Sequence, residues 1–271
     1  MKIGVFDSGL GGLSILRQMI ETMPEYNFIY LGDNAHVPYG GRSPELIYQF
    51  TKKAVNYLFS QDCALIITAC NTVTAIALRK IQDNYLPKHY PDRKILGVIL
   101  PAAETICENN YKKVGVIGTK ATIHSHEFEK KIKHLEEKVE VIEKACPLLV
   151  PVIEEEIYNQ EVLDLLLEQY LTDFKKEKVE ALILGCTHYG LIKKEIAAFL
   201  GDGVNLIDEA EICTNKLKKY LKKHPEIDKK LGKRSERNYL VTDLTATYQN
   251  FFDTFLGECF KKEDKLKLVK L

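Results

Sequence analysis

Three features are missing from this sequence, and each absence excludes a class of protein. The 271 residues carry no net charge, because 38 basic residues balance 38 acidic ones, so no overall field draws the chain to nucleic acid or to an anionic membrane. No apolar run approaches the roughly 18 residues of a membrane span. The N-terminus lacks the basic and apolar segments of a signal peptide. We therefore expect a soluble cytoplasmic protein that requires neither nucleic acid nor a membrane.

Paired cysteine spacings are also absent. The sequence has seven cysteines and no C-x-x-C motif, whereas disulfide frameworks and zinc knuckles need paired spacings. Taken singly, most such cysteines are small buried hydrophobic residues. We expect reduced thiols and no metal. The cysteines are Cys63, Cys70, Cys107, Cys146, Cys186, Cys213 and Cys259.

What is present is an alternation of short apolar runs with longer amphipathic stretches. Runs that are apolar on both faces are typical of parallel strands covered by helices. The pattern predicts an α/β protein. The predicted strands are 3–6, 28–31, 65–67, 95–99, 114–117, 182–184 and 204–207.

The chain also repeats itself. The strand and loop at 2–9 resemble those at 113–120, and the segment 64–70 resembles 181–186. The two pairs begin 111 residues apart (2 and 113) and 117 residues apart (64 and 181), in the same order. This repeat predicts two pseudosymmetric doubly wound parallel-sheet domains, formed by 1–97 and 98–208, with a mainly helical segment 209–271 that returns to the first domain.

Two basic stretches have simple interpretations. Residues 215–237 are rich in Lys and Arg, but Leu217, Tyr220 and Leu221 follow helical spacing, which favours a solvated amphipathic helix over a nucleic-acid patch. The Lys-rich end, 261–271, is predicted to be a surface tail. Neither stretch is expected to carry the function.

Ligands of doubly wound sheets bind at the carboxyl ends of strands, where helices begin. Here the segments 7–12, 69–72, 118–119 and 185–188 follow predicted strands and contain hydroxyl, amide or ionisable groups. The glycines at 9–12 match neither a P-loop nor G-x-G-x-x-G, so a nucleotide site is disfavoured. They also fit a tight strand-to-helix turn in which Asp7 caps the helix.

Cys70 and Cys186 are the sharper candidates. A helix N-terminus lowers the pKa of a thiol, and the repeat places the two cysteines on opposite sides of an interdomain cleft. Inversion at a carbon that bears hydrogen needs such a pair, because one group removes the proton from one face and the other returns a proton to the opposite face. The two cysteines therefore favour a racemase, although either could be a structural residue.

Other side chains could assist or offer alternatives. Asp7 could serve Cys70, and His188 could serve Cys186. Glu154 is a further acid, or part of an acidic first helical turn. Zinc bound by Cys186 and His188 with a third cysteine (Cys70 or Cys146), a one-thiol hydrolase or decarboxylase, and a two-domain amino-acid-binding protein are rival interpretations.

The motifs resemble those of glutamate racemases in the aspartate/glutamate racemase superfamily. The matching segments are 4–12, 30–33, 38–40, 69–72, 118–119 and 185–189. The resemblance implies two α/β domains, no cofactor, a homodimer, and interconversion of L- and D-glutamate for peptidoglycan synthesis. It implies that Cys70 and Cys186 are the acid/base pair, assisted by Asp7 and His188, and less directly by Glu154. The family commonly has one or two acids where this chain has three, at 154–156.

The resemblance also implies a set of substrate contacts, drawn from both halves of the chain. They are Asp7, Ser8, Pro38, Tyr39, Gly40, Asn71, Thr72, Thr119, Thr187 and His188.

Overall fold

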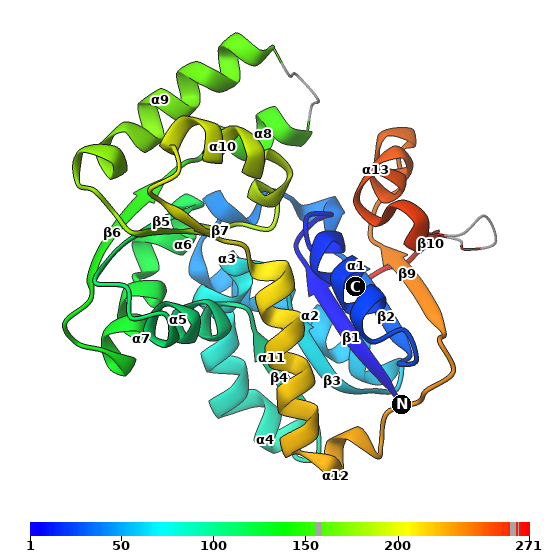
Figure 1. The fold of residues 1–271 in the computed structure, drawn as a ribbon. Coiled ribbons are helices and arrows are strands. Elements are labelled where there is room, and N and C mark those ends of the chain that lie inside the picture. Colours follow the sequence, from blue (N-terminus) through cyan, green and yellow to red (C-terminus); the bar gives the residue numbers. More distant parts are fainter. Residues whose placement is uncertain (155–158, 261–263, 265) are drawn as a thin grey trace.

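The computed structural model describes residues 1–154, 159–260, 264 and 266–271, and these form two parallel sheets covered by helices (Figure 1). The first sheet has the strand order β10-β9-β2-β1-β3-β4 and the second the order β6-β5-β7-β8, with every pairing parallel. The α/β prediction is therefore confirmed.

The strands are β1 Lys2–Asp7, β2 Phe28–Gly32, β3 Cys63–Thr68, β4 Lys94–Gly97, β5 Lys113–Gly118, β6 Glu140–Ala145, β7 Ala181–Gly185, β8 Asn205–Ile207, β9 Arg237–Val241 and β10 Leu266–Leu268. The α-helices are α1 Leu13–Thr22, α2 Pro44–Ser60, α3 Asn71–Val73, α4 Leu86–His89, α5 Ile99–Glu108, α6 Lys120–Ser125, α7 Glu127–Leu135, α8 Leu149–Glu154, α9 Gln160–Lys176, α10 Lys193–Leu200, α11 Glu209–Lys223, α12 Pro225–Asp228 and α13 Ala246–Leu256. Between α3 and α4 the helix has π-type turns at Thr74–Leu78 and Ile81–Tyr85.

The inner strands β1, β2, β3, β5 and β7 are buried on both faces, as their apolar runs predict. In β1, Ile3 and Val5 face a core shared with α1, α11 and α13, while Phe6 faces a core shared with α2 and the helix that follows β3. The second sheet lies between α5, α6 and α7 on one face and α8, α9 and α10 on the other. Because helices cover both faces of each sheet, the ends of the strands are held in fixed positions.

The two sheets have the same local topology around their central strands. Strand β1 lies between β2 and β3, and β5 lies between β6 and β7. The loops after β1 and β3 therefore meet at one sheet edge, and those after β5 and β7 meet at the equivalent edge. These are the four loops that the sequence singles out.

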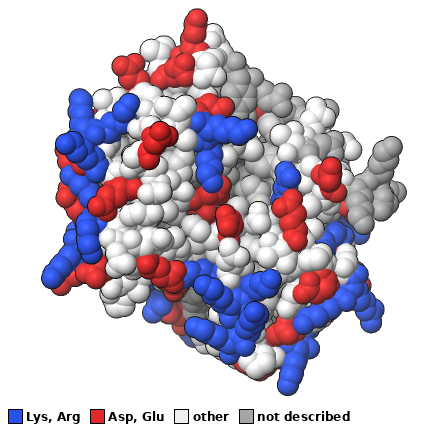
Figure 2. All heavy atoms as spheres, viewed as in Figure 1, with Lys and Arg blue, Asp and Glu red and all other residues white. Residues whose placement is uncertain are grey.

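The C-terminal segment differs from the prediction. Helix α11 buries Leu217 and Leu221 against the first sheet's core, so the amphipathic interpretation of this stretch is confirmed. The prediction of a tail is wrong at Leu266–Leu268, because this segment pairs with β9 as an edge strand, and β9 itself pairs with β2. Figure 2 shows Lys and Arg near α11 and α12 interspersed with acidic residues. Within the described ranges, no helix has the length and apolar character needed to cross a membrane.

Candidate active site

The loop after β1 holds a carboxyl group inside the protein. Asp7 ends β1 and is 1% exposed. Its Oδ2 accepts a 2.9 Å hydrogen bond from the N–H of Gly9, and its Oδ1 has no hydrogen-bond partner among the described residues. Burial raises the pKa of Asp7, opposed by the charge of His188 and the N–H groups of Gly9 and Gly12. A buried oxygen without a partner is a feature of groups that meet a ligand or a proton.

Cys70 lies beside this loop because β3 pairs with β1. The thiol is 7% exposed, and its Sγ is 3.3 Å from Ser8 Oγ. Burial and the charge of Asp7 raise the pKa of Cys70 to about 12, against smaller effects of Ser8 and the N–H of Val73. The prediction that the helix N-terminus lowers this pKa is wrong for Cys70, since lost hydration outweighs the helix dipole. At neutral pH Cys70 is a protonated thiol.

The second sheet presents a thiol, an imidazole and a carboxylate in a row. Cys186 follows β7 and is 8% exposed. His188 Nδ1 lies 3.8 Å from Cys186 Sγ, and His188 Nε2 lies 3.0 Å from Glu154 Oε1, at ion-pair distance but without hydrogen-bond alignment. Burial lowers the pKa of His188, but Cys186 and Glu154 outweigh burial and raise it to about 10. His188 is therefore a cation at neutral pH. The other two predicted acids, Glu155 and Glu156, lie outside the described residues.

The loops of the two sheets pack directly against each other. A Cβ atom added to Gly11 would lie 2.2 Å from Thr187 Oγ1 and 2.7 Å from His188 Nδ1. The charge of Cys186 also acts on the pKa of Cys70, so the two thiols are close enough to interact electrostatically. One thiol from each sheet thus belongs to a single buried site.

A second contact between the sheets involves hydroxyl groups. Thr72 Oγ1 lies 2.9 Å from Thr119 Oγ1 and 3.3 Å from Thr122 Oγ1. A Cβ atom added to Gly40 would lie 2.7 Å from Thr119 Cβ. These contacts bring predicted substrate contacts from both halves of the chain to the same place.

Three predicted substrate contacts have surroundings that the sequence did not indicate. Tyr39 OH donates a 2.6 Å hydrogen bond to Asp33 Oδ2, Asn71 Nδ2 donates one of 2.6 Å to Glu209 Oε2, and Pro38 is exposed. Sequence reasoning missed Asp33 and Glu209 as site residues. Asp33 directly follows β2, and this position at a strand end was the signal that could have found it. No sequence signal connects Glu209 to Asn71.

The geometry does not support zinc at the thiols. Among the residues that the structure describes, no cysteine belongs to a group of three side chains close enough to share a metal ion. Cys146, one of the cysteines considered as a third ligand, donates its thiol to the carbonyl of Lys144 at 3.6 Å.

Comparison with known proteins agrees with the resemblance seen in the sequence motifs. The family model for Asp/Glu/hydantoin racemases matches residues 3–217. A glutamate racemase from Aquifex aeolicus is 40% identical over 259 residues, which cover 95% of each chain.

Solved structures agree with the sequence comparison over the whole fold. The glutamate racemase of Francisella tularensis, solved in complex with D-glutamate, has a TM-score of 0.88 and 34% identity, covering 99% of this chain and 97% of its own. A glutamate racemase isoform from Bacillus anthracis has a TM-score of 0.89 and 31% identity, covering 100% and 97%. The fold, the matched family model and these full-length similarities show that the chain belongs to the Asp/Glu/hydantoin racemase family.

Proposed function

We propose that this chain is a glutamate racemase that interconverts L- and D-glutamate by proton transfer between the substrate α-carbon and two thiols, Cys70 and Cys186. The observation that carries the proposal is the pair of buried thiols at equivalent strand ends of two sheets, within one site. The names of the similar proteins and the D-glutamate in one of their structures support glutamate as the substrate.

The reaction follows from two thiols in opposite protonation states. A thiolate takes the α-proton, so the Cα–H bond breaks, an S–H bond forms and the electron pair remains on a planar carbanion. The opposite thiol then gives its proton to the other face of that carbanion. The two sulfur atoms have then exchanged protonation states, which readies the site for the reverse direction. General acid–base transfer of this kind contributes about 10²- to 10⁴-fold to the rate.

Each thiol would exchange protons with a second ionisable side chain. Asp7, whose charge contributes to the raised pKa of Cys70, would exchange a proton with that thiol or with the substrate amino group. His188, which lies between Cys186 and Glu154, would do the same for Cys186. These side chains would restore the protonation states between turnovers.

The substrate would be bound by polar groups at the strand ends, without a cofactor. Hydroxyl, amide and backbone N–H groups there suit the two carboxylates and the ammonium group of glutamate. The proposed contacts are Asp7, Ser8, Pro38, Tyr39, Gly40, Asn71, Thr72, Thr119, Thr187 and His188.

We further propose that the chain divides into one domain of 1–97 with 209–271 and another of 98–208. It would act in the cytoplasm as a homodimer and supply D-glutamate for peptidoglycan. The domain bounds rest on the internal repeat, and the homodimer and the role in peptidoglycan synthesis rest on the resemblance to glutamate racemases.

The test is incubation with L-glutamate in D₂O with chelator and reductant, following the α-proton by NMR together with optical rotation. We expect both signals to disappear, and Cys70→Ser and Cys186→Ser each to prevent this. Exchange that needs only one cysteine would favour the one-thiol chemistry, and binding without exchange would favour an amino-acid-binding protein. No exchange with either enantiomer would overturn the assignment to glutamate.

A further inference from the structure

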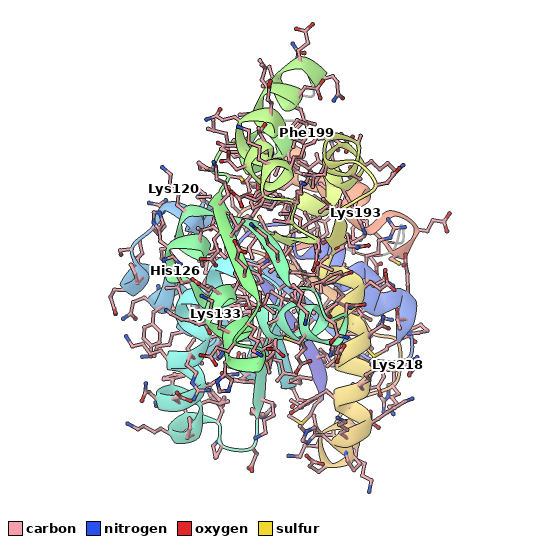
Figure 3. The ribbon with its side chains drawn as sticks, turned by 60° about the vertical axis from the view of Figure 1, so that its left-hand side comes forward. Lys120, His126, Lys133, Lys193, Phe199 and Lys218 are labelled. Carbon is pink, nitrogen blue, oxygen red and sulfur yellow. The ribbon has the colours of Figure 1, made fainter. Side chains whose placement is uncertain are left out.

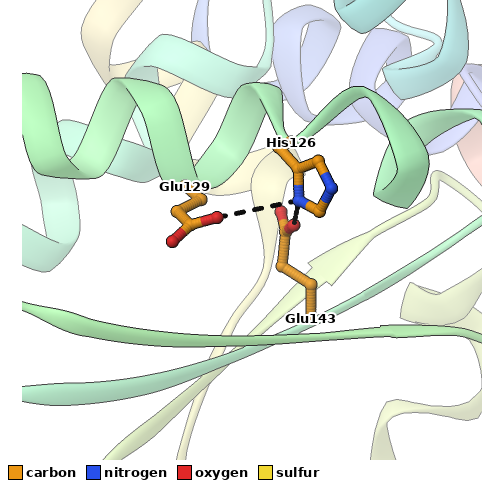
Figure 4. A group of neighbouring side chains, drawn as sticks. All are labelled: His126, Glu129 and Glu143. Carbon is orange, nitrogen blue, oxygen red and sulfur yellow. Dashed lines mark hydrogen bonds and ion pairs between the residues drawn. The ribbon is translucent and has the colours of Figure 1, made fainter.

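Three side chains that could ligate a metal converge over strand β6, away from the thiols (Figure 4). His126 lies in the turn between α6 and α7, with a left-handed φ of 54°, Glu129 lies on α7 and Glu143 on β6. One nitrogen or oxygen atom of each lies within 4.8 Å of the others. Figure 3 shows His126 along one side of the molecule, together with Lys120 and Lys133, and Lys218 of α11 along the other.

A second observation points to a ligand at this cluster. The Glu143 side chain is only 6% exposed, and its Oε1 has no hydrogen-bond partner among the described residues. Its carboxyl group points toward His126 and Glu129 (Figure 4). Leaving a buried carboxylate oxygen unpaired is unfavourable unless a cation or donor meets it.

We propose that His126, Glu129 and Glu143 form a binding site for a first-row transition-metal dication of the Zn²⁺ type. One imidazole nitrogen and carboxylate oxygens are a ligand set that Zn²⁺ accepts, with water completing the coordination. The site is separate from the thiols, so it does not depend on the proposed racemase activity.

The distances suit such an ion after a small movement. A tetrahedral Zn²⁺ with bonds of about 2.1 Å holds neighbouring ligand atoms about 3.4 Å apart. His126 Nδ1 is 3.6 Å from Glu129 Oε2, which fits directly. His126 Nδ1 is 2.6 Å from Glu143 Oε2, a hydrogen bond that must open so that Glu143 presents a carboxylate oxygen to the ion.

We expect Lys133 to lower the affinity of this site for a metal ion. Its Nζ contacts Glu129 Oε1 at 2.6 Å, which leaves Oε2 of Glu129 for the metal but adds a positive charge nearby. The expected site is therefore of moderate affinity. A bound ion would tie the α6–α7 turn to β6, and α6 is capped at its N-terminus by Thr119, which contacts Thr72.

The experiment is calorimetric titration of the full chain with Zn²⁺, with Co²⁺ as a spectroscopic substitute. We expect one equivalent to bind, to raise the Tm, and to give a Co²⁺ spectrum without thiolate-to-metal charge transfer. His126→Ala and Glu143→Gln should weaken binding by about tenfold or more, the loss that even outer-shell partners cause. His134→Ala, a matched histidine on α7, should bind like the wild type.

Equal Zn²⁺ affinity in the wild type and His126→Ala, or no binding at millimolar Zn²⁺, would overturn the proposal. A thiolate charge-transfer band would do the same, because it would place the ion on cysteines. Should His126→Ala not fold, Glu129→Gln on the helix surface replaces it, with the same expected loss. Racemase activity plays no part in these readouts, so their failure is distinct from failure of the proposed function.

Discussion

Asn71 donates a 2.6 Å hydrogen bond to the buried carboxyl group of Glu209, and this contact joins the neighbour of Cys70 to the start of α11. Helix α11 follows β8, so the bond connects a loop of the first sheet to the segment that leaves the second. Among the described residues, Glu209 Oε1 has no hydrogen-bond partner. Burial raises the pKa of Glu209 well above its ordinary value, opposed by Asn71.

This raised pKa predicts a pH-dependent stability. Between the unfolded pKa and the higher folded pKa, the folded state binds more protons than the unfolded state, so the free energy of unfolding falls as pH rises. The contribution is complete below the unfolded pKa of glutamate and is lost as pH rises toward the folded pKa. Glu209→Gln should therefore flatten the decline above the usual carboxyl range, in urea unfolding at several pH values. The exposed Glu211→Gln on the same helix should keep the wild-type slope, and an unchanged slope in Glu209→Gln would contradict the prediction.

The contact at Gly11 predicts a strong effect of a single methyl group. Gly11→Ala would place its Cβ 2.2 Å from Thr187 Oγ1, so Thr187 and His188 must shift. A displacement of about 1 Å in a catalytic site costs about 10²-fold in rate, and we expect a loss of this size in kcat/KM for glutamate. Gly41→Ala is the control, since its Cβ would meet nothing described within 4 Å. Comparable activities of the two variants would show that the loops are not packed as described.

The raised pKa of Cys70 predicts slow alkylation. With a pKa of about 12, Cys70 has little thiolate at pH 7, and iodoacetamide should modify it about 10³-fold more slowly than an ordinary free cysteine. Mass spectrometry of digested protein over time would give the rate, with an unstructured cysteine-containing peptide in the same reaction as the reference thiol. Modification of Cys70 as fast as the reference peptide would instead support the lowered pKa expected from the helix N-terminus.

The His188–Glu154 contact predicts a linked change in pKa and activity. Glu154→Gln removes a carboxylate 3.0 Å from His188 Nε2 and should lower the pKa of His188 from about 10, measured by NMR titration of the ring. His188→Asn removes the assistant itself, and kcat should fall by about 10² or more. An unchanged His188 pKa in Glu154→Gln would mean that the ion pair does not form in solution.

The sequence predicted the strands whose residues are apolar on both faces. It missed β6, β9 and β10, for a physical reason visible in their sequences. Strand β6 lies at the edge of its sheet and carries Glu140, Glu143 and Lys144, which interrupt its apolar residues, and β10 is an edge strand of three residues. Strand β9 carries Arg237 and Asn238, and only its pairing with β2, about 200 residues away in sequence, identifies it.

The sequence predicted those features of the candidate site that depend on neighbouring residues in the chain. It did not predict those that depend on contacts between residues far apart in the chain. Strand ends and the internal repeat identified Cys70 and Cys186, because each of these two signals lies within a short segment of the sequence. The sign of the Cys70 pKa was not predictable, since burial comes from packing of the whole domain. The hydrogen bond between Asn71 and Glu209 was also not predictable from the sequence, because the two residues are 138 positions apart.

The close packing of the loops after β1 and β7 leaves each thiol at most 8% exposed. In the proposed reaction glutamate must reach both sulfur atoms, so we expect these loops to part and close again in each turnover, with rates of their own. Solvent viscosity would then slow the enzyme even though the chemistry is unaltered. In the proposed reaction the same closure would exclude bulk water from the short-lived carbanion, so the sulfur atom that delivers its proton would set the handedness of the product.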